Sequence, residues 1–72
     1  MLNKEEITKN FIDEYQDAFY KIDMYDLRYY FKKYFFENYG CNLDLRVHSS
    51  REAWLSVVNC YKAKKGELKC LK

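Results

Sequence analysis

The sequence predicts a small α+β domain over residues 1–72, with its elements in the order helix, helix, strand, helix, strand. Three observations support this fold class. Apolar residues recur at helical spacing in three segments, residues 41–48 alternate between apolar and polar, and glycine occurs only at positions 40 and 66, each at an expected helix end. At 49% hydrophobic and 19% aromatic, the composition is that of a folded chain rather than a disordered one.

The first helix is predicted over residues 4–21. Asn3 is a favourable N-cap, and Glu6 follows three residues later, where its side chain can complete a capping box. The apolar residues after this cap fall on one stripe of a helix: Ile7, Phe11, Tyr15, Ala18, Phe19 and Ile22.

The second helix is predicted over residues 24–39, between an Asp23 cap and a Gly40 stop. Its aromatic residues cannot share one side. Met24, Leu27, Phe31, Tyr34 and Phe35 gather on one face, and Tyr25, Tyr29, Phe36 and Tyr39 gather on the other. We expect Phe31, Tyr34 and Phe35 to pack on the first helix, Tyr25 and Tyr29 to stay partly exposed, and Phe36 to be shared between the sheet and solvent.

The strand is predicted over residues 41–48, where apolar and polar residues alternate. The third helix is predicted over residues 50–65, with Ser49 as N-cap and Gly66 as its end, and with Trp54 mostly buried against the second helix. Residues 67–71 form a short second strand. The two strands pair, parallel or antiparallel, in a sheet packed by three helices with the second helix central.

No catalytic, cofactor or metal motif is present, so the sequence predicts a protein that is not an enzyme. The single histidine, His48, is separated from Cys41 by seven positions, and an odd spacing on a strand places the two side chains on opposite faces. Cys41, Cys60 and Cys70 lack the C-x-x-C spacing of zinc sites. No cofactor is expected.

The odd number of cysteines and the lack of an apolar leader or membrane-spanning stretch predict a cytoplasmic protein. The residue usage favours Lys, Asn, Ile, Tyr and Phe over Gly, Ala, Arg and Pro, which indicates an AT-rich bacterial, phage or plasmid genome. The net charge of +2 is divided unevenly, because residues 1–26 carry −4 and residues 27–72 carry +6.

Three surfaces are candidates for binding a partner. The first is the second aromatic face of residues 24–39 with its neighbouring lysines, namely Tyr25, Tyr29, Lys32, Lys33 and Phe36. The second is an acidic ridge formed by Glu6, Asp13 and Asp17, and the third is a basic end formed by Lys62, Lys64 and Lys65. Coverage of the second aromatic face by the chain's own sheet and third helix is the competing structural explanation.

The sequence thus predicts a small non-enzymatic protein-binding module that occupies the surface of another protein. In size and in the lack of catalytic residues it is comparable, as a class only, with phage or mobile-element inhibitors such as anti-CRISPR proteins. A nucleic-acid-binding regulator that uses the basic second half is the alternative. A homodimer formed through the aromatic face is a third reading.

Overall fold

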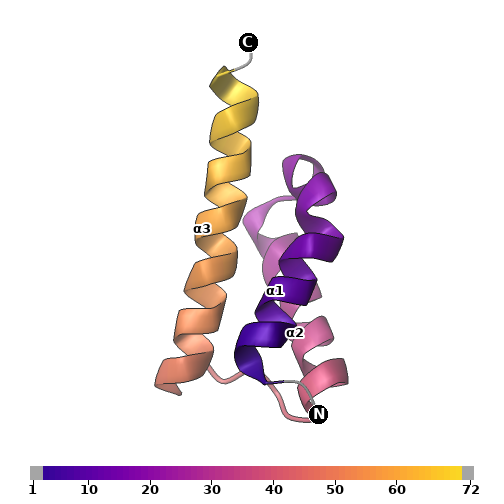
Figure 1. The fold of residues 1–72 in the computed structure, drawn as a ribbon, viewed down its shortest axis with the longest axis vertical. Helices are drawn as coiled ribbons and strands as arrows, with labels where there is room; N and C mark the ends of the chain where they lie inside the picture. The colour runs from indigo at the N-terminus through magenta and orange to yellow at the C-terminus, as the bar shows by residue number, and fades with distance from the viewer. Residues whose placement is uncertain (1–2, 71–72) are drawn as a thin grey trace.

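The computed structural model describes residues 3–70, with side chains described as far as Gly66, and over this range the chain is entirely helical (Figure 1). The α-helices are α1 (Lys4–Tyr15), α2 (Met24–Tyr39) and α3 (His48–Cys70), and a 3₁₀ helix, η1 (Gln16–Lys21), follows α1. No strand occurs within residues 3–70. The predicted α+β fold with a two-stranded sheet is therefore wrong.

The first predicted helix is divided into two forms of helix. The Asn3 side chain accepts a hydrogen bond of 2.8 Å from the backbone N–H of Glu6, which confirms the N-cap. After Tyr15 the chain continues as the more tightly wound 3₁₀ helix η1, so the α-helix is shorter than the predicted range of 4–21. Phe19 within η1 is fully buried and meets the Tyr61 ring edge-on, with ring centroids 5.7 Å apart.

Both predicted ends of α2 are confirmed. The Asp23 carboxylate accepts a hydrogen bond of 2.8 Å from the backbone N–H of Asp26. Gly40 adopts the left-handed conformation (φ 85°), and its N–H donates to the Phe36 carbonyl at 2.9 Å. A residue with a Cβ is strained in this conformation, which is why glycine ends the helix well.

Residues 41–47 form an irregular loop with a turn at residues 45–46, rather than the predicted strand. The Asp44 carboxylate accepts hydrogen bonds from the backbone N–H of Arg46 at 2.9 Å and from its guanidinium at 3.0 and 3.1 Å, and these bonds lower the pKa of Asp44. The Val47 N–H donates to the Asp44 carbonyl at 3.0 Å. Leu43 is buried, whereas Cys41 is exposed. The alternating pattern fails because a strand needs a partner for its backbone hydrogen bonds, and the second predicted strand does not form.

The start of α3 also differs from the prediction. The helix begins at His48, and the Arg51 N–H donates to the Val47 carbonyl at 2.9 Å. Ser49 is therefore inside the helix rather than its N-cap. Its hydroxyl instead accepts a hydrogen bond of 2.7 Å from the Lys4 ammonium of α1, so it ties the first turns of α1 and α3 together.

The end of α3 lies beyond the predicted residue 65, because the helix continues through Gly66 to Cys70. The predicted strand at 67–71 is wrong over residues 67–70, and residue 71 lies outside the described range. A glycine inside a helix costs only about 1 kcal/mol relative to alanine, and Gly66 does not adopt the positive φ of Gly40. At about 1.5 Å per residue, α3 is long enough to extend past the other helices at its C-terminal end (Figure 1).

The helix at the centre of the fold is α1 rather than α2. The backbone of α1 approaches closely both α2 and α3, and η1 also packs on α3. The core combines residues from every helix and from the loop at 41–47: Ile7, Phe11, Phe19, Leu27, Phe31, Phe35, Leu43, Ala53, Val57 and Tyr61. The predicted central position of α2 is therefore wrong, because α1 lies against both neighbours.

Large rings fill the space between α2 and α3. Trp54 of α3 stacks on Phe31 of α2 with ring centroids 5.9 Å apart and is partly buried against the core, so it packs on the second helix as predicted. The Tyr61 hydroxyl donates a hydrogen bond of 2.6 Å to the Ile22 carbonyl, which joins α3 to the segment between η1 and α2. Within the described chain, no helix is both long and apolar enough to cross a membrane.

Candidate protein-binding surface on α2

The inner face of α2 completes the hydrophobic core. Leu27, Phe31 and Phe35 are buried at exposed fractions of 0 to 1%. Phe11 of α1 meets Phe31 edge-on at 5.0 Å and Tyr34 at 5.5 Å between ring centroids. Phe31 and Phe35 are thus buried as predicted, and Tyr34 is half-buried beside α1. Burial, together with the nearby Glu14 carboxylate, raises the pKa of the Tyr34 phenol.

The opposite side of α2 carries the predicted binding residues, and all of them are exposed. We call Tyr25, Tyr29, Lys32, Lys33 and Phe36 the α2 aromatic face. The exposed fractions of Tyr25, Tyr29 and Phe36 are 84%, 61% and 51%, and both lysines are exposed. Tyr25 and Tyr29 remain open as predicted. Phe36 was expected to be shared between the sheet and solvent, and this is wrong because no sheet forms within residues 3–70. Among the residues whose side chains are described, none buries Tyr25, Tyr29 or Phe36. Tyr39, which was predicted on the same face, is instead partly buried against the core beside Phe35, so internal coverage, the competing explanation, applies at this end of the face alone.

The α2 aromatic face is one continuous stripe along the helix. Tyr25 and Tyr29 are one helical turn apart, Lys32 and Lys33 lie one turn further on, and Phe36 follows after another turn. At its edge, Tyr29 meets the Tyr30 ring at 5.6 Å. Tyr30 in turn stacks on Tyr15 of α1 at 5.8 Å, so part of this surface is supported by rings that reach the core.

The predicted acidic ridge is exposed but not uniform. Glu6 lies in the first turn of α1, and Asp13 borders a groove between α1 and α3. Asp17 lies in η1, outside the α-helical spacing on which the prediction of a single ridge relied. The three carboxylates therefore do not share the setting expected from one continuous helix.

The predicted basic end of α3 is also divided. Lys62 is exposed, whereas Lys64 and Lys65 are half-buried. The Lys65 ammonium lies 4.9 Å from the centroid of the Tyr61 ring, where the ring attracts the cation. At about 100° per residue, Lys62 and Lys64 are directed about 160° apart around the helix. The three lysines do not form one compact patch.

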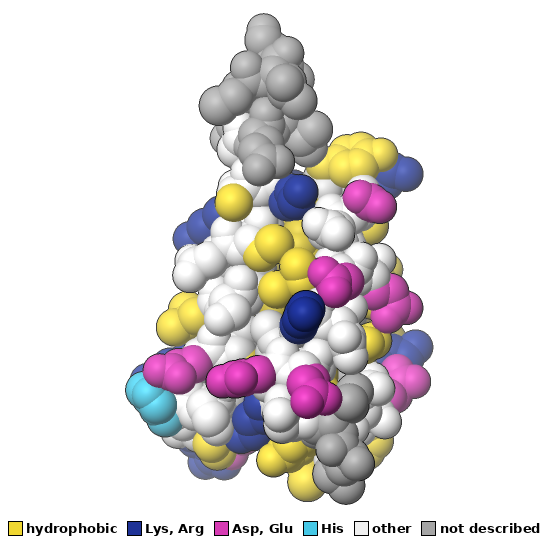
Figure 2. Space-filling view, viewed as in Figure 1, with side chains coloured by type: hydrophobic (Ala, Val, Ile, Leu, Met, Phe, Trp, Pro, Cys, Tyr) yellow, Lys and Arg dark blue, Asp and Glu magenta, His cyan; other side chains and the backbone are white. Residues whose placement is uncertain are grey.

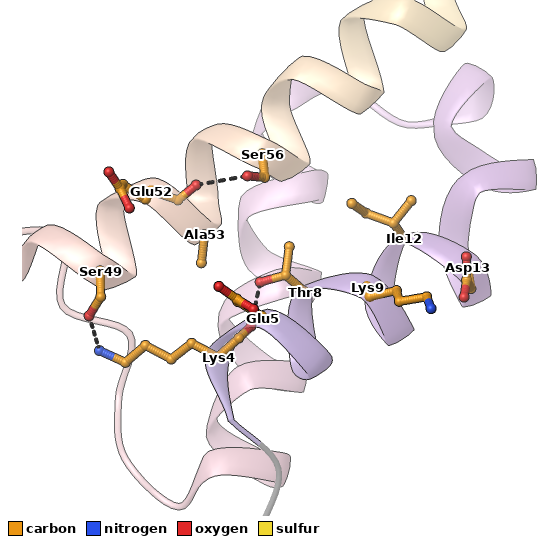
Figure 3. A pocket seen from close by; sticks show the side chains of 10 residues that line it. All are labelled: Lys4, Glu5, Thr8, Lys9, Ile12, Asp13, Ser49, Glu52, Ala53 and Ser56. Carbon is orange, nitrogen blue, oxygen red and sulfur yellow. Dashed lines mark hydrogen bonds between the residues drawn. The ribbon is translucent and has the colours of Figure 1, made fainter.

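A groove that the sequence analysis did not find runs between α1 and α3, with a volume of about 450 Å³. Figure 3 shows its lining, in which Ile12 and Ala53 are the apolar members and charged or hydroxyl side chains surround them. Figure 2 shows the same side of the molecule, with acidic and basic side chains interspersed around a small hydrophobic area. The groove depends on how two helices pack, which no local sequence pattern encodes.

The polar groups of this groove largely bond to their own helices. The Thr8 hydroxyl donates to the Lys4 carbonyl at 2.7 Å, and the Ser56 hydroxyl donates to the Glu52 carbonyl at 3.1 Å. The contact between Lys4 and Ser49 is that of a charged amine donating to a hydroxyl. The Lys4 ammonium also lies 5.6 Å from the Tyr39 ring centroid, where the ring attracts the cation.

In the part of the chain that is described, no group of three or more His, Cys, Asp or Glu side chains is placed to hold a metal ion. His48 instead pairs with Glu52, one turn along α3, at 2.9 Å. Comparison of the chain with protein-family models, with curated proteins and with solved structures finds no significant match.

Proposed function

We propose that this chain is a small protein-binding module that docks on another protein through the α2 aromatic face. The observation that carries the proposal is the exposure of Tyr25, Tyr29 and Phe36 along one stripe, while the inner face of the same helix fills the core without them. Aromatic residues dominate the energetically important positions of protein interfaces. An exposed stripe of them on so small a protein is a surface that a partner can cover.

The energetic scale supports a modest affinity. The side chains of Tyr25, Tyr29 and Phe36 have about 200 Å² of surface each, and at their exposed fractions of 84%, 61% and 51% they offer roughly 400 Å² in total to a partner. Burying that area is worth about 10 kcal/mol at ~25 cal/mol per Å², and association costs about 4–15 kcal/mol. Lys32 and Lys33 add attraction to an acidic rim on the partner and lay their methylene stems beside the rings. We therefore propose a partner surface that is apolar at its centre and acidic at its edge.

The module acts in the cytoplasm by occupying a surface of its partner, in the manner of small phage or mobile-element inhibitors. The free thiols of Cys41 and Cys60 support a reducing compartment. Occupation of a surface requires no chemistry from the chain itself. It requires only that the α2 aromatic face fits the partner and excludes the partner's other ligands.

The test is affinity capture with a matched pair of variants. The wild-type chain, Tyr25→Ser/Tyr29→Ser and the control Tyr20→Ser/Leu55→Ser are immobilised and exposed to lysate of the source organism, with and without nuclease. The control removes two exposed apolar side chains that lie on η1 and α3. We expect wild type and control to retain a partner protein both with and without nuclease treatment. Tyr25→Ser/Tyr29→Ser should fail to retain it. Equal retention by all three would reject the α2 aromatic face.

Nucleic-acid binding is the second candidate, favoured by the position of Lys32 and Lys33 beside exposed rings that can stack on bases. It receives less support from Lys62, Lys64 and Lys65, which are spread around α3. If nucleic acid is the ligand, capture is lost after nuclease treatment. Binding to a single-stranded oligonucleotide would then fall steeply with salt concentration and with Lys32→Glu/Lys33→Glu.

A further inference from the structure

We infer that a second copy of this chain fits the α2 aromatic face, so that two α2 helices pair in antiparallel orientation around a two-fold axis at Tyr29. The inference rests on the proposed function, because it uses the same surface, and it adds self-association as a second use of that surface. It is carried by the distribution of charged and aromatic side chains around Tyr29. That distribution is complementary to itself in one orientation and repulsive in the other.

Four residues are arranged symmetrically around Tyr29: Tyr25, Lys32 and Lys33 of the α2 aromatic face, and the exposed Asp26 beside them. At about 100° per residue, Tyr25 and Lys32 lie about 40–60° to one side of Tyr29, and Asp26 and Lys33 lie about 40–60° to the other. Tyr25 and Lys32 are seven residues apart, as are Asp26 and Lys33, and Tyr29 lies within half a residue of the midpoint of each pair. The α2 helix therefore has two edges, one with an aromatic ring and a lysine, and the other with an aspartate and a lysine.

In an antiparallel two-fold pair, each edge meets the same edge of the other copy in the reverse direction. Asp26 of each copy then lies opposite Lys33 of the other copy. On the other edge, Tyr25 and Lys32 face each other in the same reciprocal way, which is a cation–π arrangement. Tyr29 meets its own counterpart at the axis. Two ion pairs and two cation–π contacts thus follow from one register.

A parallel pair gives the opposite result. The edge with Asp26 and Lys33 then faces the edge with Tyr25 and Lys32 of the second copy. Lys33 of each copy lies against Lys32 of the other, so two pairs of like charges repel. The three residues that carry the charges are free to pair with another chain. Asp26, Lys32 and Lys33 are exposed, and the ion pairs found among the described residues involve other groups. The antiparallel register is therefore the one that the charges select.

The available area indicates a weak dimer. Tyr25 and Tyr29 expose roughly 300 Å² of ring surface in each copy, or about 600 Å² in total, below the ~1,200–2,000 Å² of stable complexes, although the lysine stems add to it. The dissociation constant should accordingly be on the order of 100 µM. The groove between α1 and α3 offers no comparable self-complementary pattern.

The test is a charge exchange across the predicted contact, followed by sedimentation velocity from about 10 µM to about 1 mM, a range that brackets the expected dissociation constant. Asp26→Lys and Lys33→Asp are each prepared alone, mixed in equal amounts, and combined in one chain. Tyr29→Lys, which places like charges at the axis, is a further variant. Asp13→Lys and Lys62→Asp make the same charge changes away from the stripe and serve as controls. Circular dichroism verifies that each variant retains its helix content.

We expect wild type and both controls to dimerise, and each single variant on the stripe to weaken dimerisation at least tenfold. The equal mixture of Asp26→Lys with Lys33→Asp should dimerise again, and so should the doubly substituted chain, since both restore opposite charges across the axis. A wild type that stays monomeric over this range would overturn the inference. So would dimerisation that is unaffected by Lys33→Asp and Tyr29→Lys, or a mixture that stays monomeric.

The two proposals fail in different ways. A monomeric wild type that still captures another protein through Tyr25 and Tyr29 overturns the homodimer and leaves the protein-binding function standing. A chain whose self-association and capture both survive Tyr25→Ser/Tyr29→Ser overturns both proposals, because the α2 aromatic face then binds neither a second copy nor another protein.

Discussion

The two faces of α2 are both aromatic, yet one is core and the other is surface. Phe31 and Phe36 are the same residue type, five positions apart on the same helix. Phe31 is fully buried, whereas Phe36 is 51% exposed. The difference arises because α1 and Trp54 of α3 pack on the side of Phe31, and no described element packs on the side of Phe36. Residue type alone does not decide burial; the packing partners decide it.

The composition of the two faces reflects this difference. The inner face uses Leu27, Phe31 and Phe35, which have no polar atom in the side chain to satisfy. The outer face uses tyrosine and lysine, whose polar ends tolerate water while their apolar parts cover surface. The tyrosine content of the outer face thus predicted its partial exposure correctly.

The largest expected effect comes from the matched pair Phe31→Ala and Phe36→Ala. Phe31→Ala leaves a cavity beside Phe11 and Trp54 and should cost about 3–5 kcal/mol in the free energy of unfolding, which is most of the stability of so small a domain. Phe36→Ala should cost less than about 1 kcal/mol. Denaturation in urea measures both values. Similar losses for the two variants would contradict the distinction between the faces.

A smaller effect is expected at Trp54, which covers Phe31 from the side of α3. Because Trp54 is half-buried, Trp54→Ala should cost about 2–3 kcal/mol, at or below the lower end of the range for buried aromatic residues. Trp54→Phe retains a ring over Phe31 and should cost less. The same urea titration distinguishes them, and a Trp54→Ala variant as stable as wild type would show that the stacked contact contributes nothing.

A still smaller effect concerns Tyr34, at the border of the inner face. Its pKa is raised above the ordinary value near 10 by burial and by Glu14, so the folded state favours the neutral phenol. The stabilisation is fully present below pH ~10 and is lost as the pH rises through the pKa of Tyr34 in the folded chain. Tyr34→Phe should therefore lose less stability than wild type between pH 9 and about 12. Parallel losses in both chains would show that Tyr34 does not contribute.

The features that the sequence predicted correctly depend on neighbouring residues. The caps at Asn3, Asp23 and Gly40 each use a side chain or backbone within a few positions, and the structure contains all three. The division of α2 into two faces follows from helical spacing, except at the helix ends, where Met24 of the inner face is exposed and Tyr39 of the outer face is partly buried. Such local features need no knowledge of the rest of the fold.

The features that it predicted wrongly depend on distant partners. The alternation in residues 41–48 requires a second strand, and Gly66 does not stop α3 to provide one. Asp44 closes a turn with Arg46 instead. The central position of α1 and the groove between α1 and α3 likewise follow from packing between segments. The exposure of Tyr25 and Tyr29 was predicted correctly, whereas the arrangement of the helices that leaves them exposed was not, because α2 was predicted at the centre of the fold in place of α1.

The most direct measurement of the central claim is the free energy of unfolding of Tyr25→Ser/Tyr29→Ser. If the α2 aromatic face has no structural role within the chain, this variant should unfold within about 0.5 kcal/mol of wild type and keep its helix content, although it loses two large apolar side chains. A loss of about 2 kcal/mol or more would contradict the account, because it would mean that the chain's own core depends on Tyr25 and Tyr29.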